Sequence, residues 1–356
     1  MANEAPLSFE AAAFQSYVRG LRRFWREEAY RGTVDAARAE QTADPAEIES
    51  RLRLNPAYQL YAWLERYSQR LKYYGRWGIV RWMEQRNELL ERVLEEAARR
   101  HPERLRLDAR LEIPAYVADV DTHQHRGGLW SDACDAFAYE TAASGYSFSL
   151  FDVQTPMAIY ADTARNLAPD AREIVDLGCT VGGSTRSLKR AFPNAKVVGV
   201  DVCAPPLRLA HLRALEQKLE IYWYQANAEY LPFESDSKDL VTCHWLFHEM
   251  PPNAIRNCLR EARRVLRRGG GFMAFDMYLV PGDAIGRWLH AGYAARNNEP
   301  FALSFSTMDM KAELEGAGFA GVEMRIAYPE PSQTVREPDL PSERTHYMTM
   351  ITARAV

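Results

Sequence analysis

A glycine-rich stretch at residues 175–188, "VDLGCTVGGSTRSL", has the composition of a loop that holds a ligand through its backbone. It follows an apolar run and precedes a helical pattern, as such loops do in nucleotide-binding folds. A dinucleotide-binding loop, however, is written G-x-G-x-x-G. Here Cys179 and Thr180 separate Gly178 from the next glycines, and Asp176 stands where the charge of a pyrophosphate would be poorly accommodated. The stretch therefore predicts a ligand-binding loop, but not one for a dinucleotide.

A histidine and a glutamate stand side by side in the stretch "WLFHEMPP", where they could remove a proton from a substrate. His248 and Glu249 lie just past residues 240–245, an apolar run that predicts a strand. Free imidazole titrates at about pH 6.5, which suits general-base catalysis near neutral pH. The pair could instead anchor the helix that follows, so both roles stay open on the sequence alone.

Two further histidines occur in the polar stretch "DVDTHQHRGGLWSD". If this stretch is extended, side chains alternate and Asp121, His123 and His125 share one face. That spacing is compatible with a metal site completed by Asp132 or Cys134, with contacts to a substrate or cofactor, or with a structural turn at the following glycines. We expect the histidines to contact substrate, and we expect no metal site.

Short apolar runs rich in β-branched residues alternate with amphipathic stretches from residue 173 onward. This alternation predicts β-α units and a doubly wound, mostly parallel α/β sheet. The expected strands are residues 174–177, 197–200, 221–224, 240–245, 271–276, 321–327 and 346–353. The expected helices are residues 184–192, 207–219, 253–266 and 308–317. Because no long helix separates the last two strands, they should pair antiparallel, which gives seven strands with an antiparallel last strand.

The first part of the chain has a different pattern, typical of helices alone. One apolar stripe at helical spacing comprises Leu60, Trp63, Leu64, Tyr67 and Leu71, and a second comprises Leu89, Leu90, Val93, Leu94 and Ala97. We expect such stripes to form core or a subunit interface, although the aromatic one could line a substrate cleft. The sequence therefore predicts an N-terminal all-helical region at residues 1–115, acting as a lid or in dimerisation, and a second domain at residues 116–356.

Composition and charge exclude several classes of protein. The net charge of −4 and the mixing of arginines with acidic and apolar residues predict no nucleic-acid binding. No apolar run approaches the roughly 20 residues of a membrane span, and the N-terminus lacks a secretory pattern. Five cysteines without a C-x-x-C pair suggest neither a disulfide framework nor a zinc ribbon. We therefore expect a cytoplasmic protein that does not act at a membrane.

Five sequence elements in the second half occur in the order of a known family. The first strand ends with Asp176, Gly178, Thr180 and Gly182 in the pattern D-x-G-x-G-x-G, with threonine at the second glycine position. Asp201 ends the second strand, and "NAEYLPF", "DLVTCHWLFHEMPP" and "EARRVLRRGGGFMAFD" follow. This half resembles class I S-adenosylmethionine-dependent methyltransferases, especially those of ubiquinone and menaquinone biosynthesis. The resemblance implies a Rossmann-like methyltransferase fold and S-adenosyl-L-methionine as the cofactor.

The same resemblance assigns roles to individual residues. Asp201 is expected to accept hydrogen bonds from both ribose hydroxyls, and Asn227 replaces the aspartate that usually accepts from the adenine amino group. The expected cofactor-binding residues are Asp176, Gly178, Cys179, Thr180, Gly182, Asp201, Val202, Asn227, Ala228 and His244. The expected substrate-binding residues are His123, His125, Tyr146 and Trp245. Residues 142–167 are expected to fold over the cofactor, with Tyr146 and Phe148 as lid residues.

We therefore expect methyl transfer to a small-molecule acceptor, with general-base or positioning help from His248 and Glu249. The helical region and residues 281–301 would roof the acceptor pocket. The alternatives are a protein or RNA methyltransferase, or a non-catalytic regulator that binds S-adenosylmethionine. The chain could also form a homodimer.

Overall fold

An eight-stranded sheet organises the part of the chain that the computed structural model describes, which is residues 8–125, 128, 132–143, 154–279, 282–328 and 347–356. The strands are β1 (Leu105–Arg106), β2 (Glu173–Leu177), β3 (Lys196–Asp201), β4 (Tyr222–Gln225), β5 (Lys238–His244), β6 (Leu266–Leu279), β7 (Phe319–Tyr328) and β8 (Tyr347–Ala355). Their order across the sheet is β1-β4-β3-β2-β5-β6-β8-β7. Tyr146 and Phe148 lie outside the described residues.

The sheet confirms the predicted α/β fold with one addition. Strands β1 to β6 pair in parallel, whereas β8 lies between β6 and β7 and runs antiparallel to both. The seven predicted strands are all present. The eighth is β1, in which Leu105 and Arg106 pair with Trp223 and Tyr224 at the edge of the sheet. Two residues are too few to show the alternating pattern by which strands are found in a sequence.

Helices cover both faces of this sheet. One face packs against α9 (Gln154–Leu167), α10 (Gly183–Ala191) and α11 (Ala204–Glu216), and the other packs against α12 (Pro252–Val265) and α16 (Met310–Gly316). The alternation along β6 shows this division, because Phe272 and Ala274 point to the α12 side while Met273 and Phe275 point to the α9 side. A sheet buried on both faces accounts for its continuous apolar runs.

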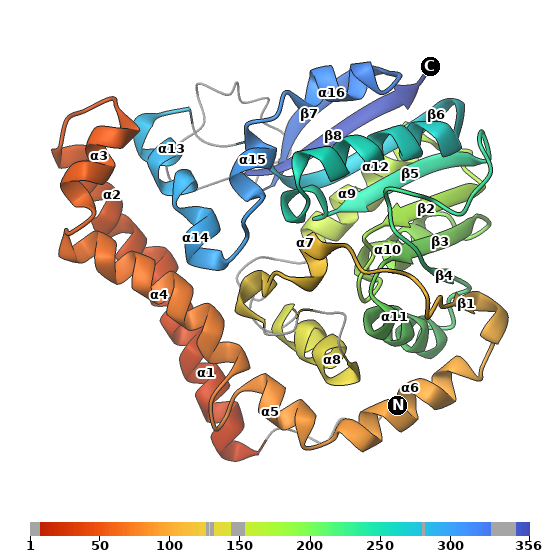
Figure 1. Cartoon of the computed structure of the whole chain (residues 1–356), viewed down its shortest axis with the longest axis horizontal. Helices are drawn as coiled ribbons and strands as arrows, with labels where there is room; N and C mark the ends of the chain where they lie inside the picture. The colour runs from red at the N-terminus through yellow and green to blue at the C-terminus, as the bar shows by residue number, and fades with distance from the viewer. Residues whose placement is uncertain (1–7, 126–127, 129–131, 144–153, 280–281, 329–346) are drawn as a thin grey trace.

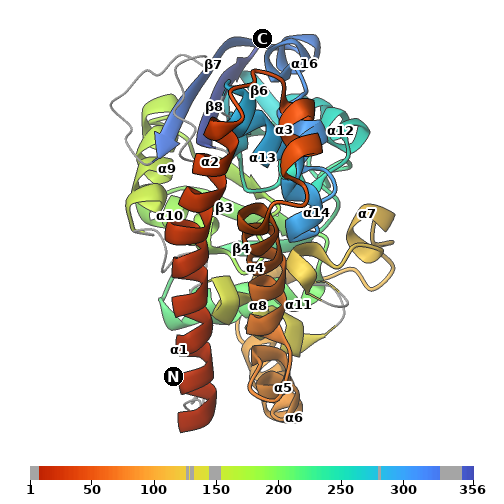
Figure 2. The same ribbon diagram turned by 90° about the vertical axis from the view of Figure 1, so that its left-hand side faces the viewer.

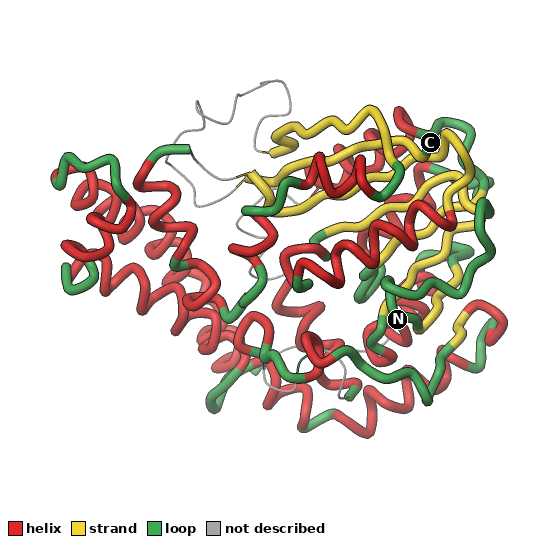
Figure 3. Tube along the Cα trace, turned by 45° about the horizontal axis from the view of Figure 1, so that its top comes forward, coloured by secondary structure: helices red, strands yellow, loops and turns green. Residues whose placement is uncertain are grey.

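A series of helices precedes the sheet and curves around one side of it (Figures 1 and 3). We call α1 (Phe9–Phe24), η1 (Trp25–Ala29), α2 (Tyr30–Ala39), α3 (Pro45–Leu52), α4 (Pro56–Tyr73), α5 (Ile79–Glu84) and α6 (Asn87–Ala98) the helical arm. Its helix starts are defined locally. Ser8, Asp44 and Asn55 each accept a hydrogen bond from the backbone N–H two or three residues on, and proline begins α3 and α4.

Short helices link the helical arm to the sheet. They are η2 (Pro102–Arg104), α7 (Ala115–Ala118), η3 (Thr122–Gln124) and α8 (Ala133–Ala142). In Figure 1, α8 lies between α5 and α11, and its alanine-rich sequence is buried almost throughout. No helix among the described residues is long and apolar enough to cross a membrane.

The buried face of α4 differs from the one predicted. Leu64 is buried, but Trp63 and Tyr67 are 55% and 41% exposed and stack on each other at the surface. The face that α4 turns inward carries polar residues instead, namely Glu65, Ser68, Gln69 and Lys72. Trp63 and Tyr67 therefore do not form core, because another face of this helix turns inward and lines the cavity, and the alternative prediction of a subunit interface stays a prediction. The second stripe is confirmed at Leu90, Leu94 and Ala97 in α6.

The insert between β6 and α16 joins the helical arm to the sheet. It contains α13 (Ala284–Ala291), α14 (Tyr293–Asn297) and α15 (Ala302–Ser306), and Figure 2 shows α13 and α14 beside α3 and α4. Glu65 of α4 forms a buried ion pair with Arg296 and accepts a 2.6 Å hydrogen bond from Asn297. These contacts fix the position of α4 over the sheet.

Candidate active site

A cavity of about 730 Å³ lies between the carboxyl ends of the central strands, the helical arm and the insert. Of the predicted site residues, its wall includes Gly178, Cys179, Thr180, Asp201, Val202, Asn227, Ala228, His244, Trp245, His123, His125, His248 and Glu249. The carboxyl edge is where ligands bind in open α/β sheets. Predicted site residues from five separate segments of the chain therefore line the same cavity.

The glycine-rich loop after β2 is shaped by close packing and unusual backbone angles. Gly178 and Gly182 have φ values of 62° and 73°, and even Thr180 has a φ of 43°. A Cβ atom on Gly182 would lie 2.3 Å from Cη2 of Trp223, so only glycine fits between the loop and this ring. The loop therefore turns tightly and presents its backbone to the cavity.

Asp201, at the end of β3, holds this loop in place. Its carboxylate accepts a hydrogen bond from the backbone N–H of Thr180 at 2.8 Å and another from that of Cys203 at 2.9 Å. Asp201 is only 7% exposed, and burial raises its pKa. It lines the cavity, and each carboxylate oxygen can accept more than one hydrogen bond. The residues present therefore fit a ribose, whose two hydroxyls need such an acceptor.

Asp176 supports the loop from behind rather than from the cavity wall. It is fully buried, and its carboxylate accepts hydrogen bonds from the hydroxyls of Tyr160, Ser184, Thr185 and Thr242 at 2.6–3.0 Å. Burial raises the pKa of Asp176, but four donated hydrogen bonds favour the charged form. These bonds connect β2, β5, α9 and the start of α10.

Asn227 and His244 line the cavity on either side of this loop. The amide oxygen of Asn227 accepts from the backbone N–H of Glu229 at 2.9 Å. The ring of His244 stacks on Phe275 with centroids 5.1 Å apart, and burial lowers its pKa to about 4. His244 is therefore neutral at physiological pH and acts as an aromatic wall.

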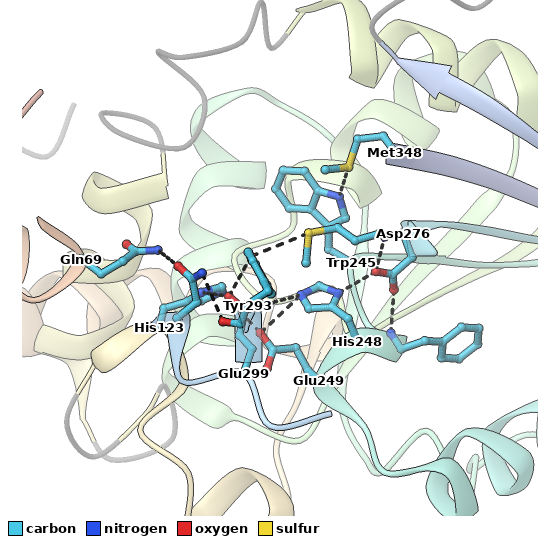
Figure 4. A network of polar contacts seen from close by, with 12 residues as sticks. Gln69, His123, Trp245, His248, Glu249, Asp276, Tyr293, Glu299 and Met348 are labelled. Atoms are coloured by element: carbon cyan, nitrogen blue, oxygen red, sulfur yellow. Dashed lines mark hydrogen bonds and ion pairs between the residues drawn. The ribbon is translucent and has the colours of Figure 1, made fainter. Parts of the chain in front are cut away.

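His248 lines the cavity, and its orientation is fixed by Asp276, whose Oδ1 lies 2.6 Å from Nδ1 of the imidazole (Figure 4). Asp276 is fully buried at the inner part of β6 and also accepts from the backbone N–H groups of Phe247 and Met277 at 2.7 Å. Burial alone would lower the pKa of His248, but Asp276 and Glu249 raise it well above the ordinary value. Nε2 points toward Glu249, whose Oε1 lies 3.5 Å away.

His123 reaches the same place from the linker before α8. Its Nε2 lies 3.3 Å from Oε1 of Glu249, and its Nδ1 lies 2.8 Å from Oε1 of the fully buried Glu299. The backbone of His123 has a φ of 54°, which is uncommon for a residue other than glycine. Asn298 donates a 2.8 Å hydrogen bond to the carbonyl of Asp121, which joins this turn to the insert.

The linker is not extended, so the predicted alternation of its side chains is wrong. Residues Thr122–Gln124 form a short 3₁₀ helix, which turns His123 and His125 in different directions. His125 lies 3.0 Å from Asp135 and stacks on Tyr73, with ring centroids 4.6 Å apart. His125 still lines the cavity, but His123 alone joins His248 and Glu249.

Cationic and aromatic side chains of the helical arm form the wall of the cavity that we call the far wall. Arg22, Trp25, Arg26 and Tyr30 line the cavity around η1, a π-helical turn within an otherwise continuous helix. Turns of this kind are often found at functional sites. Lys72 is buried, with its ammonium 4.6 Å from the ring centroid of Tyr73. Burial and the neighbouring Arg22 lower the pKa of Lys72 well below its ordinary value.

Comparison with known proteins agrees with this geometry. Residues 174–270 match the family described as Methyltransferase domain. The chain is 33% identical over 125 residues to a demethylmenaquinone methyltransferase of Thermus thermophilus, covering 35% of this chain and 55% of that one. It is 36% identical over 100 residues to a ubiquinone biosynthesis O-methyltransferase of Aeromonas salmonicida, covering 28% and 40%.

A solved structure, the YcgJ protein from Bacillus subtilis, is 24% identical, with a TM-score of 0.38 over 48% of this chain and 69% of that one. The chain spans about half the length of the curated relatives that it matches. The matched residues include β2 to β5, the glycine-rich loop and Asp201. Residues 174–270 therefore form a methyltransferase domain.

Proposed function

We propose that the protein transfers the methyl group of S-adenosylmethionine to a small-molecule acceptor bound in the cavity. The observation that carries this proposal is the continuity of the cavity, whose wall runs from Gly178 and Asp201 to His248 and Glu249. Cofactor and acceptor would therefore share one space. A cavity that is walled by the helical arm as well as by the sheet suits a small molecule better than a polymer.

The chemistry asks little of the protein beyond alignment and proton removal. When bound, the cofactor supplies an electrophilic methyl group on a sulfonium. The glycine-rich loop and Asp201 would hold the cofactor, while Trp245 and His244 would form the wall beside it. His248 would be charged, because Asp276 and Glu249 raise its pKa well above the ordinary value, and it would position Glu249, whose Oε1 lies 3.5 Å from its Nε2. The acceptor's proton would pass to the carboxylate of Glu249 as the bond to the methyl group forms.

The far wall suggests the class of acceptor. Trp25, Tyr30 and Tyr73 offer aromatic surface, and Arg22 and Lys72 offer positive charge. An anionic group beside Lys72 would favour its charged form and offset the effect of burial. We therefore propose an acceptor with a flat apolar body and an anionic group. Residues 1–115 would be its roof, and the exposed pair of Trp63 and Tyr67 would be available for a homodimer.

Calorimetry and a methyl-transfer assay test this function. The full chain should bind S-adenosylmethionine and S-adenosylhomocysteine but not NAD. It should release S-adenosylhomocysteine with small anionic aromatic acceptors and not with tRNA or unfolded protein. Binding of NAD instead, or methylation confined to a polymer, would contradict the proposal.

Two lysine variants test the class of acceptor. Lys72→Met should raise the KM for the acceptor about tenfold or more with little change in kcat, because it removes uniform binding. Lys238→Met is the matched control, since Lys238 is equally buried but pairs with Glu173 away from the cavity. Equal kinetic effects of the two variants would refute the role of Lys72.

A further inference from the structure

We propose that His123, His248 and Glu249 bind a divalent transition-metal ion at the acceptor end of the cavity. These residues come from two separate places: His123 lies in η3, and the neighbours His248 and Glu249 lie in the turn that follows β5. One ligand atom from each lies within 4.8 Å of the others. Two imidazoles and one carboxylate are a donor set that binds ions such as Zn²⁺ and Fe²⁺ at catalytic sites.

The orientation of both rings supports binding through Nε2. Asp276 lies 2.6 Å from Nδ1 of His248, and Glu299 lies 2.8 Å from Nδ1 of His123. Both carboxylates are fully buried. Histidine ligands usually donate their second N–H to a carboxylate or carbonyl, which fixes the tautomer and aims the other nitrogen at the metal. This arrangement occurs twice here, and both Nε2 atoms face Glu249 (Figure 4).

The distances between the ligand atoms also suit a shared ion. Oε1 of Glu249 lies 3.3 Å from Nε2 of His123 and 3.5 Å from Nε2 of His248. Ligand atoms about 2.1 Å from one ion are roughly 3.0–3.5 Å apart in tetrahedral or octahedral geometry. These two distances already fit, and the two imidazole nitrogens, which lie within 4.8 Å of each other, would have to reach the same separation on binding.

The ion would have positions left for other ligands, since three protein ligands leave a catalytic site open. The residues line the cavity in which the acceptor is proposed to bind. An oxygen of the acceptor could complete the coordination, which would orient it and favour transfer of its proton to the second carboxylate oxygen of Glu249, the one that does not bind the ion. This role rests on the proposed function, whereas binding of the ion rests on the geometry alone. No redox step is involved.

Cobalt provides a direct probe, because Co²⁺ bound by nitrogen and oxygen ligands absorbs visible light. The full chain, freed of metal by a chelator that is then removed, would be titrated with CoCl₂ and then with ZnCl₂. We expect one equivalent of Co²⁺ to give a saturable visible spectrum that Zn²⁺ abolishes. The spectrum should be lost in His123→Asn and in Glu249→Gln. Asp276→Asn should bind about 10- to 100-fold more weakly, as expected when a group that orients a ligand is lost.

A surface histidine provides a matched control. His101 has the same φ of 54° as His123 and lies 3.3 Å from a carboxylate, that of Glu103. His101→Asn should leave the spectrum unchanged, and asparagine tolerates this backbone conformation at both positions. Absence of Co²⁺ and Zn²⁺ binding in the wild type would overturn the proposal. So would an equal loss of binding in His101→Asn and His123→Asn.

The same samples separate this inference from the proposed function. S-Adenosylhomocysteine binding by calorimetry shows whether each variant is folded and keeps its cofactor site. If His123→Asn binds this ligand normally but binds no Co²⁺, the metal site is supported. If the wild type binds Co²⁺ but methylates no acceptor, the metal site stands and the proposed function fails. If it methylates an acceptor equally well in the presence and absence of chelator and binds no Co²⁺, the metal site fails alone.

Discussion

Replacing Asp201 by alanine should weaken binding of S-adenosylhomocysteine roughly 100-fold. The carboxylate offers about four acceptor sites, and Thr180 and Cys203 occupy two of them through their backbone N–H groups. Both ribose hydroxyls would donate to this same carboxylate, which lines the cavity. A hydrogen bond to a charged group contributes about 1.5–3 kcal/mol. Since two bonds to one carboxylate are not additive, we expect a total loss of about 3 kcal/mol, where each 1.4 kcal/mol is tenfold in Kd.

Isothermal titration calorimetry of three variants checks this value. Asp201→Asn keeps one acceptor oxygen and should weaken binding only about tenfold. Asp239→Ala is the matched control, because Asp239 accepts two backbone hydrogen bonds, from Arg172 and Glu173, at the opposite end of β2. It should lower stability without changing affinity. The assignment of Asp201 to the ribose is refuted if Asp201→Ala binds within twofold of the wild type, or if Asp239→Ala loses as much affinity.

Three further perturbations have defined outcomes. The pKa of His244 is lowered to about 4 in the folded chain, so as the pH falls below about 6.5 the unfolded chain takes up a proton before the folded chain does. The free energy of unfolding should therefore drop by about 3 kcal/mol between pH 6.5 and pH 4. Denaturant titrations of His244→Phe should show a smaller drop. Glu65→Gln should cost about 3 kcal/mol in thermal unfolding, because it leaves the buried Arg296 without its charge partner, and an unchanged melting temperature would contradict this. Gly199→Ala should destabilise by about 1–3 kcal/mol, because the new Cβ would lie 2.6 Å from Trp223, whereas Gly183→Ala has open space and should be neutral.

The cofactor side of the cavity was predictable because its residues sit at the ends of local patterns. Asp201 follows an apolar run directly, and Gly178 and Thr180 lie within a few residues of another. The carboxyl ends of parallel strands meet at one edge of a sheet, so a residue that directly follows a predicted strand is expected at that edge. The same reasoning placed His248 and Glu249 beside the loop.

The part of the cavity around His123 and His248 depends on contacts between segments that are distant in the sequence, and no local sequence pattern predicts such contacts. Glu299 lies in an insert without a recognisable motif, and its role appears only where η3 meets that insert. Asp276 could have been suspected, since it is an acidic residue within an otherwise apolar run. Hydrophobic periodicity was misleading for α4, because the face of this helix that lines the cavity carries Glu65 and Lys72, while Trp63 is exposed to solvent.

The two-residue strand β1 has a consequence for handling the protein. Without it, β4 would end the sheet with unpaired backbone N–H and C=O groups between Tyr222 and Gln225, flanked by aromatic side chains. Uncovered sheet edges of this kind recruit strands from other molecules. A chain shortened past Arg106 would therefore expose the edge of β4, and it would also expose the apolar faces of α8 and α11 that the helical arm covers, so both surfaces would favour self-association.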